Sequence, residues 1–108
     1  MSLKQTELFS LKGRTALVTG GSRGIGRMIA AGFIAQGAKV YISSRKADVC
    51  RKTATELSEG GGTCIALPVD ASTVAGAKEL AKAFGEREAK LDILVNNAGA
   101  AWGAPAEE

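Results

Sequence analysis

The sequence of 108 residues contains no histidine. This absence excludes Ser-His-Asp and Cys-His nucleophile pairs and every histidine-ligated metal site within these residues. Cysteine is scarce as well, because Cys50 and Cys64 form neither a CxxC redox motif nor a zinc-ligand spacing. A disulfide between them is conceivable, but a pair of small buried thiols in an intracellular protein is the better interpretation. We therefore expect no metal site.

Long hydrophobic runs are also missing. The apolar stretch 28–38 lies between Arg27 and Lys39 and falls well short of the roughly 20 residues that a membrane span requires. Residues 1–12 lack the apolar core of a signal peptide. The formal net charge of +3 is spread along the chain and does not indicate a nucleic-acid partner. With 45% hydrophobic and 23% charged residues, the sequence is typical of one globular domain, which we expect in the cytoplasm.

Short apolar runs alternate with helical patterns along the chain. Near-continuous apolar runs without polar alternation are typical of strands covered on both faces. The expected strands are residues 15–19, 39–43, 63–69 and 91–95, and the expected helices are 24–36, 47–57 and 73–89. This order predicts an α/β fold, the first β-α-β-α-β-α-β portion of a Rossmann-like, doubly wound parallel sheet. Residues 1–108 would form the N-terminal part of a single domain.

Two of these helices differ in character. Helix 24–36 has hardly a polar face, so we expect it to be well buried, with Gly37 ending it. Helix 73–89 is amphipathic, and Ser72 is its expected N-cap. The expected apolar face of this helix comprises Val74, Ala77, Leu80, Ala81 and Phe84.

Glycines cluster where the first strand meets the first helix. The segment is Thr19-Gly20-Gly21-Ser22-Arg23-Gly24-Ile25-Gly26. Glycines in such a turn let backbone N–H groups approach a phosphate that side chains would block, and the helix N-terminus adds partial positive charge. A tight turn packed against the sheet is the alternative, but the flanking strand, helix and second strand favour a pyrophosphate site.

The pattern Thr-Gly-x-x-x-Gly-x-Gly resembles the fingerprint of the short-chain dehydrogenase/reductase family. Two further segments agree with this resemblance, since Pro68-Val69-Asp70 ends the third strand and Asn96-Asn97-Ala98-Gly99 follows the fourth. The similarity extends from about Leu11 to Trp102. It implies a Rossmann fold that binds a dinucleotide, with Asp70 hydrogen-bonded to the adenine ring and the asparagine segment lining the coenzyme cleft.

The position of the asparagine segment also has a physical basis. In an open parallel sheet, ligands bind beyond the carboxyl ends of the strands where the winding direction switches, and the first and fourth strands flank that switch. Asparagine side chains donate and accept hydrogen bonds, and the small Ala98 and Gly99 would let a ribose come close. The alternative is a polar turn in which Asn96 and Asn97 cap loose backbone groups, and the resemblance implies both roles.

Charge favours NADP(H) over NAD(H). An NAD-selective fold usually has an acidic residue about 20 residues after the glycines, whereas here the second strand ends in Ser43-Ser44-Arg45-Lys46. Arg45 could hold a 2′-phosphate with two parallel hydrogen bonds, and the resemblance implies that Arg23 reaches the same phosphate. The alternative for Arg45 and Lys46 is a solvated loop.

We expect residues from four segments to bind the coenzyme. They are Gly20, Ser22, Arg23, Gly24, Ile25 and Gly26 for the pyrophosphate and its neighbouring ribose, Ser44 and Arg45 for the 2′-phosphate, Asp70 and Ala71 for the adenine, and Asn97, Ala98 and Gly99 for the second ribose.

We next consider which residues could be catalytic. The resemblance implies a serine, a Tyr-x-x-x-Lys pair and an asparagine, all downstream of the Asn-Asn-Ala-Gly segment. The sequence has one tyrosine, Tyr41, which lies in an expected strand with Arg45 four residues later, so it is not that pair. We therefore name no catalytic residue in residues 1–108.

The resemblance implies that the parent protein is an NADPH-dependent oxidoreductase acting on a carbonyl or alcohol. Ketoacyl reductases, which act on 3-oxoacyl thioesters, are the most similar members, and a homo-oligomer, either a tetramer or a dimer, is implied.

An uncovered fourth strand would be an aggregation hazard, so we expect the natural chain to continue past Glu108. A chain that ends there would instead be a non-catalytic dinucleotide-binding or interaction module. A Rossmann-like domain that has lost its ligand is a third possibility. Trp102 would either line the substrate side of the cleft or pack against residues beyond Glu108.

Overall fold

Strands and helices form at the apolar and amphipathic runs of the sequence. The computed structural model describes residues 10–97. In chain order the elements are β1 (Thr15–Thr19), α2 (Gly24–Ala35), β2 (Lys39–Ser43), α3 (Ala47–Ser58), β3 (Thr63–Leu67), α4 (Val74–Gly85) and β4 (Ile93–Asn96). Within residues 10–97, the strands form one parallel four-stranded sheet in the order β3-β2-β1-β4. The Rossmann-like α/β architecture expected from the sequence is therefore confirmed.

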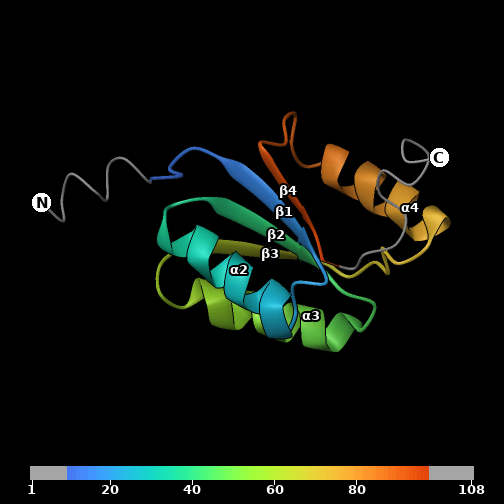
Figure 1. Cartoon of the computed structure of the whole chain (residues 1–108), viewed down its shortest axis with the longest axis horizontal. Coiled ribbons are helices and arrows are strands. Elements are labelled where there is room, and N and C mark those ends of the chain that lie inside the picture. The colour runs from blue at the N-terminus through green and yellow to red at the C-terminus, as the bar shows by residue number, and fades with distance from the viewer. Residues whose placement is uncertain (1–9, 98–108) are drawn as a thin grey trace, which may run out of the picture.

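The strand order places a change of winding direction beside β1. The chain builds outward from β1 through β2 to β3, then crosses back and pairs β4 with the free side of β1. As a result, α2 and α3 cover one face of the sheet and α4 covers the other (Figure 1). The carboxyl ends of β1 and β4 lie side by side at this point, which is where doubly wound sheets bind ligands.

Alternate residues along β1, β2 and β3 supply two separate hydrophobic cores. The core under α2 and α3 contains Ala16, Val18, Ala30, Ala38, Val40, Ile42, Cys50, Ala54 and Cys64. The core under α4 contains Leu17, Tyr41, Leu67, Ala71, Leu80 and Phe84. Because strands buried on both faces have no polar side, this burial explains the near-continuous apolar runs of β1 and β2, whereas Leu94 in β4 is 41% exposed.

Both cysteines are buried and unpaired, as expected for a pair of small buried thiols. Burial raises the pKa of the Cys50 thiol to about 11 and that of the Cys64 thiol to about 12. Both thiols are therefore protonated and unreactive at neutral pH. Among residues 10–97, no helix combines the length and the apolar content that a membrane span needs.

The expectation that helix α2 is well buried is wrong. Of its residues only Gly26 and Ala30 are buried, whereas Ile25 is 66% and Met28 is 69% exposed. The reason is geometric, since α2 packs on β1 and β2 and beside α3, and nothing among the described residues covers its remaining side. An apolar side chain is buried only where another element lies against it.

Helix α4 also differs from its prediction at both ends. Its N-cap is Thr73, not Ser72, because the Thr73 hydroxyl accepts a hydrogen bond from the Gly76 N–H at 2.9 Å. Ser72 instead donates to Asp70. The helix ends at Gly85, so the expected continuation to residue 89 is wrong.

The apolar face of α4 is narrower than its spacing predicts. Leu80 and Phe84 are buried, whereas Val74 is 60% exposed and Ala81 is exposed as well. Smaller differences concern the strands, because β3 ends at Leu67 before Pro68 and β4 begins only at Ile93.

Past the end of α4, Glu88 accepts a hydrogen bond from the Tyr41 hydroxyl at 2.6 Å and pairs with Lys39 at 2.6 Å. These contacts tie the connection between α4 and β4 to the middle of the sheet. Burial first, and the Glu88 carboxylate second, raise the pKa of Tyr41 to about 12.

Asp92 ties the start of β4 to the start of β1. Its carboxylate accepts a hydrogen bond from the Thr15 N–H at 2.8 Å and lies 3.4 Å from Lys90 and 3.7 Å from Arg14. The backbone hydrogen bond from Thr15, followed by the hydrogen bond and charge of Lys90, lowers the pKa of Asp92 below its ordinary value. The ionised carboxylate therefore stabilises the register between the two strands.

Replacing Leu80 by alanine should lower the free energy of unfolding by roughly 2–5 kcal/mol, because it removes a fully buried side chain and leaves a cavity. Val74→Ala, on the same helix, is the matched control and should change it by less than about 0.5 kcal/mol. Urea unfolding of both variants measures the difference. Equal losses would contradict the core assignment.

Asp92→Asn should make the free energy of unfolding depend less steeply on pH in the acid range. Because the folded-state pKa of Asp92 is lowered, its stabilisation is present above the unfolded-state pKa and is lost as pH falls through the folded-state pKa. The wild type should therefore lose stability more steeply than the variant as pH falls below about 4. Chemical unfolding at a series of pH values tests this, with the exposed Glu79→Gln as a control for removing one negative charge. Parallel pH profiles for Asp92→Asn and the wild type would contradict the expectation.

Candidate functional site

The glycine-rich loop joins the carboxyl end of β1 to helix α2. Gly20 and Gly24 have φ angles of 66° and 62°, which favour glycine. Gly21 has no room for a side chain, since a Cβ there would lie 2.7 Å from Ile42 Cγ2. Its N–H donates to the Ser43 carbonyl at 3.1 Å, which fixes the loop to the end of β2. Glycine is therefore required at these three positions of the motif, by backbone conformation at two of them and by lack of space at the third.

The first turn of α2 has neither a side-chain cap nor an acidic residue. Its N-cap, Arg23, makes no side-chain hydrogen bond to the helix. The other helices of the described part differ, because α4 is capped by Thr73 and α3 has Asp48 in its first turn. The unsatisfied N–H groups and the positive end of the α2 dipole are thus left available to an anion.

Helix α2 approaches the ends of β1 and β4 closely at Gly26. A Cβ at this position would overlap the Gly20 carbonyl oxygen and lie 2.7 Å from Asn97 Nδ2. Asn97 Nδ2 donates to the same Gly20 carbonyl at 3.2 Å. The Thr19 hydroxyl contacts Asn96 Oδ1 at 3.1 Å, so the two asparagines hold the ends of β1 and β4 together. Both thus have the supporting role that the sequence suggested.

A cleft of about 320 Å³ lies beyond the carboxyl ends of the strands. It is lined by Gly20, Ser22, Arg23, Ser43, Ser44, Arg45, Val69, Asp70, Ala71 and Ser72. The structure therefore brings together predicted residues from the glycine loop, the end of β2 and the end of β3. Ser43, Val69 and Ser72 were not predicted. The Ser43 hydroxyl is fully buried and finds no hydrogen-bond partner within residues 10–97.

A smaller cavity of about 100 Å³ adjoins this cleft. It is lined by Ser22, Arg23, Ser44, Arg45, Lys46 and Val49. Lys46 is the N-cap of α3 and Val49 lies in its first turn. Neither was among the predicted site residues, although a basic residue directly before a helix start could have indicated this position. The concentration of guanidinium and ammonium groups suits a doubly charged anion.

Asp70 lies in the cleft with a fixed orientation. Its carboxylate accepts hydrogen bonds from the Ser72 hydroxyl at 2.6 Å and the Ser72 N–H at 3.0 Å. These hydrogen bonds, with a smaller effect of the Arg45 charge, lower the pKa of Asp70. Gly76 allows the start of α4 to pack against the Asp70 carbonyl, where a Cβ would overlap. Asp70 is therefore an ionised acceptor at the edge of the cleft.

The remaining predicted residues are placed as follows. Gly24, Ile25 and Gly26 form the first turn of α2 beside the loop. Ala98, Gly99 and Trp102 lie outside the described residues. In residues 10–97 no group of three or more His, Cys, Asp or Glu side chains is arranged to hold a metal ion.

Two larger cavities lie away from this end of the sheet. One of about 610 Å³ is formed by the end of α2 and residues 60–63, at the amino ends of the strands. One of about 580 Å³ lies between α3 and β3. Neither includes the glycine loop or the end of β1, so size alone does not identify the binding site.

A doubly wound parallel sheet, with an uncapped helix after a glycine turn at its switch point, defines a protein of the Rossmann class. The family model described as short chain dehydrogenase matches residues 14–108. The chain belongs to the short-chain dehydrogenase family.

Individual relatives agree with this assignment. A rhamnolipids biosynthesis 3-oxoacyl-[acyl-carrier-protein] reductase of Pseudomonas aeruginosa is 61% identical over 99 residues, which are 92% of this chain and 38% of that protein. The solved structure of the Pseudomonas aeruginosa RhlG/NADP active-site complex has a TM-score of 0.80 at 57% identity. The match covers 92% of this chain and 40% of the chain in that structure. The structure of L-sorbose reductase from Gluconobacter frateurii, complexed with NADPH and L-sorbose, has a TM-score of 0.79 at 34% identity. The match covers 85% of this chain and 35% of the reductase. The chain thus spans about two fifths of the length of these relatives.

Gly26→Ala should destabilise the protein by roughly 1–3 kcal/mol, because the new methyl group forces α2 away from the Gly20 carbonyl. Gly32→Ala, in the same helix, is the matched control. Apart from the neighbouring backbone of α2, no atom lies within 4 Å of a Cβ at Gly32, so this change should be neutral or stabilise by up to about 1 kcal/mol. Urea unfolding compares the two, and equal effects would contradict the close approach.

Proposed function

We propose that this chain is the coenzyme-binding part of an NADP(H)-dependent oxidoreductase that transfers hydride between NADPH and a carbonyl or alcohol substrate. The observation that carries the proposal is the uncapped N-terminus of α2, open beside a cleft with basic walls. In the described part of the chain, no acidic residue in the first turn or at its N-cap competes for those N–H groups. A dinucleotide's pyrophosphate would satisfy them.

The residues fit such a coenzyme segment by segment. The backbone around Gly20 and from Gly24 to Gly26 would hold the pyrophosphate, because Gly20 and Gly24 carry no side chain that could block the approach of phosphate oxygens. Asp70 and Ala71 would contact the adenine, and Asn97, with Ala98 and Gly99, the second ribose. The ionised Asp70 suits an acceptor role toward an amino group or hydroxyl.

The small basic cavity supports NADP(H) over NAD(H). Arg23, Ser44, Arg45 and Lys46 surround a volume of about 100 Å³, which suits a single phosphate group. No acidic residue stands at the end of β2 where an NAD-selective fold would need one. Lys46 is an addition to the residues predicted from the sequence. We assign the 2′-phosphate to this cavity.

Hydride transfer is the chemistry that a bound nicotinamide coenzyme supplies, and this chain would orient the coenzyme. Tyr41 has no part in proton transfer, because it is 2% exposed in the core and its pKa is raised to about 12. Within residues 10–97 the cleft offers no tyrosine, histidine or lysine pair for that step. We propose that the proton donor lies outside residues 10–97.

The substrate proposal rests on the relatives. We propose a 3-oxoacyl thioester, since the 61% identical relative carries the name of a 3-oxoacyl-[acyl-carrier-protein] reductase. We also propose that the parent protein is a homo-oligomer, a dimer or a tetramer, and that it works in the cytoplasm. These proposals follow from family membership and concern the complete protein.

Arg45→Asp should raise the Kd for NADPH about tenfold or more, because a cation that would pair with the 2′-phosphate becomes an anion that repels it. The Kd for NADH should change far less. Fluorescence titration of the full-length protein with each coenzyme measures both values, followed by NADPH oxidation with 3-oxoacyl substrates.

Lys78→Asp, on the exposed surface of α4, is the matched charge-reversal control and should leave both Kd values unchanged. An unchanged NADPH Kd in Arg45→Asp would show that the 2′-phosphate lies elsewhere. Coenzyme binding without any turnover of carbonyl or alcohol substrates would favour a non-catalytic dinucleotide-binding module.

A further inference from the structure

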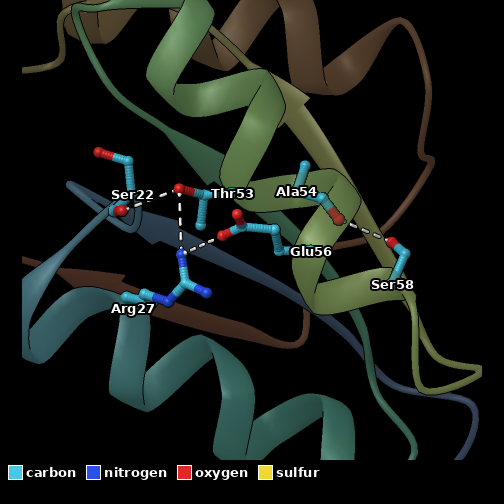
Figure 2. A network of polar contacts seen from close by, with 6 residues as sticks. All are labelled: Ser22, Arg27, Thr53, Ala54, Glu56 and Ser58. Atoms are coloured by element: carbon cyan, nitrogen blue, oxygen red, sulfur yellow. Dashed lines mark hydrogen bonds and ion pairs between the residues drawn. The ribbon is translucent and has the colours of Figure 1, made fainter.

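One buried side chain ties helix α3 to the glycine loop. Thr53, which is 3% exposed, donates from its hydroxyl to the Ser22 carbonyl at 2.9 Å (Figure 2). The two residues lie 31 positions apart in the sequence. Among residues 10–97, Thr53 is the one residue outside the loop and α2 that forms a hydrogen bond to the Ser22–Arg23 segment.

The direction of this hydrogen bond follows from the Ser22 carbonyl, which can only accept, and Arg27 is a second partner of the same hydroxyl. The Arg27 guanidinium lies 3.4 Å from the Thr53 hydroxyl oxygen and 3.0 Å from Glu56, in the arrangement that Figure 2 shows. A guanidinium can only donate, and a hydroxyl has one proton to give. Thr53 therefore accepts from Arg27 while it donates to Ser22, and the two contacts together hold its side chain in one orientation. Glu56, on the same helix as Thr53, holds Arg27 in place.

The other parts of the loop are held by different contacts. Gly21 donates to the Ser43 carbonyl, and the Gly20 carbonyl accepts from Asn97. These bonds fix the start of the loop without Thr53. Loss of the Thr53 hydroxyl would therefore release mainly Ser22 and Arg23.

Ser22 and Arg23 form one wall of the small basic cavity, and the start of α3 forms the opposite wall through Lys46 and Val49. Thr53 lies about two turns along the same helix from Lys46. The hydrogen bond from Thr53 to Ser22 therefore sets the distance between the two walls. A planar peptide adds to this effect, because a fixed Ser22 carbonyl also fixes the adjoining Arg23 N–H.

We propose that Thr53 is a positioning residue that sets the preference for NADPH over NADH. It does so by holding Ser22 and Arg23 at the separation from α3 that the 2′-phosphate requires. This inference rests on the proposed function, and it concerns a residue that touches neither cavity nor cleft directly.

The test uses the full-length protein with Thr53→Val, which keeps the shape of the side chain and removes the hydroxyl. The Kd for NADPH should rise about tenfold, while the Kd for NADH should rise less than about threefold. Thr53→Ser keeps the hydroxyl and should restore the NADPH Kd to within about threefold of the wild type. At saturating NADPH, kcat should be retained while KM for NADPH rises.

Ser58→Ala is the matched control on the same helix. The Ser58 hydroxyl donates to the Ala54 carbonyl at 2.8 Å and accepts from the Cys64 N–H at 3.1 Å, so its hydrogen bonds do not involve the glycine loop. Its loss should lower the melting temperature and leave the ratio of NADPH to NADH affinity unchanged. A purely structural role for Thr53 would give the same result in Thr53→Val, which would overturn the inference.

A second route avoids any folding defect of Thr53→Val. Arg27→Met should weaken NADPH binding about threefold, because the Thr53 side chain loses a contact that helps to hold its hydroxyl toward Ser22. If Arg27 acts through Thr53, the double variant should bind NADPH no more weakly than Thr53→Val alone. Additive effects, or an unchanged NADPH Kd in Arg27→Met, would overturn the inference. A wild type that binds neither coenzyme would instead refute the proposed function itself.

Discussion

The close approach of α2 to the ends of β1 and β4 is the constraint on which the site depends. Gly26 lies against the Gly20 carbonyl, which also accepts the Asn97 amide at 3.2 Å. This contact brings the start of a helix, the glycine loop and the end of β4 to one place. A side chain at position 26 would separate them, because the overlapping atom is backbone and cannot turn away.

The helices of the described part differ in how the free N–H groups of their first turns find hydrogen-bond acceptors. Thr73 caps α4, so that helix is complete within the fold. Helix α2 has no such cap, and its first turn contains no acidic residue. An uncapped helix costs about 1 kcal/mol in stability, which the protein would recover when an anion binds. A local departure from good helix design thus coincides with the site, as is common where function competes with stability.

The basic residues around the site have to be held together, since like charges repel. Arg23 comes from the glycine loop, Arg45 from the end of β2 and Lys46 from the start of α3. The hydrogen bond between Thr53 and Ser22 connects two of these segments across the sheet surface. A rigid frame of uncharged hydrogen bonds therefore supports a cluster of cations that would otherwise separate.

Local patterns in the sequence determined the strands, the order of the elements and the glycine turn, because backbone conformation and burial on both faces depend on neighbouring residues. They could not determine the exposure of Ile25 and Met28, since that depends on which element lies beside α2. Nor could they separate Thr73 from Ser72 as the cap, because both hydroxyls can accept and only the fold commits Ser72 to Asp70. Thr53 is an ordinary helix residue by pattern. Only the packing of α3 against the loop, 31 positions away, gives it a partner.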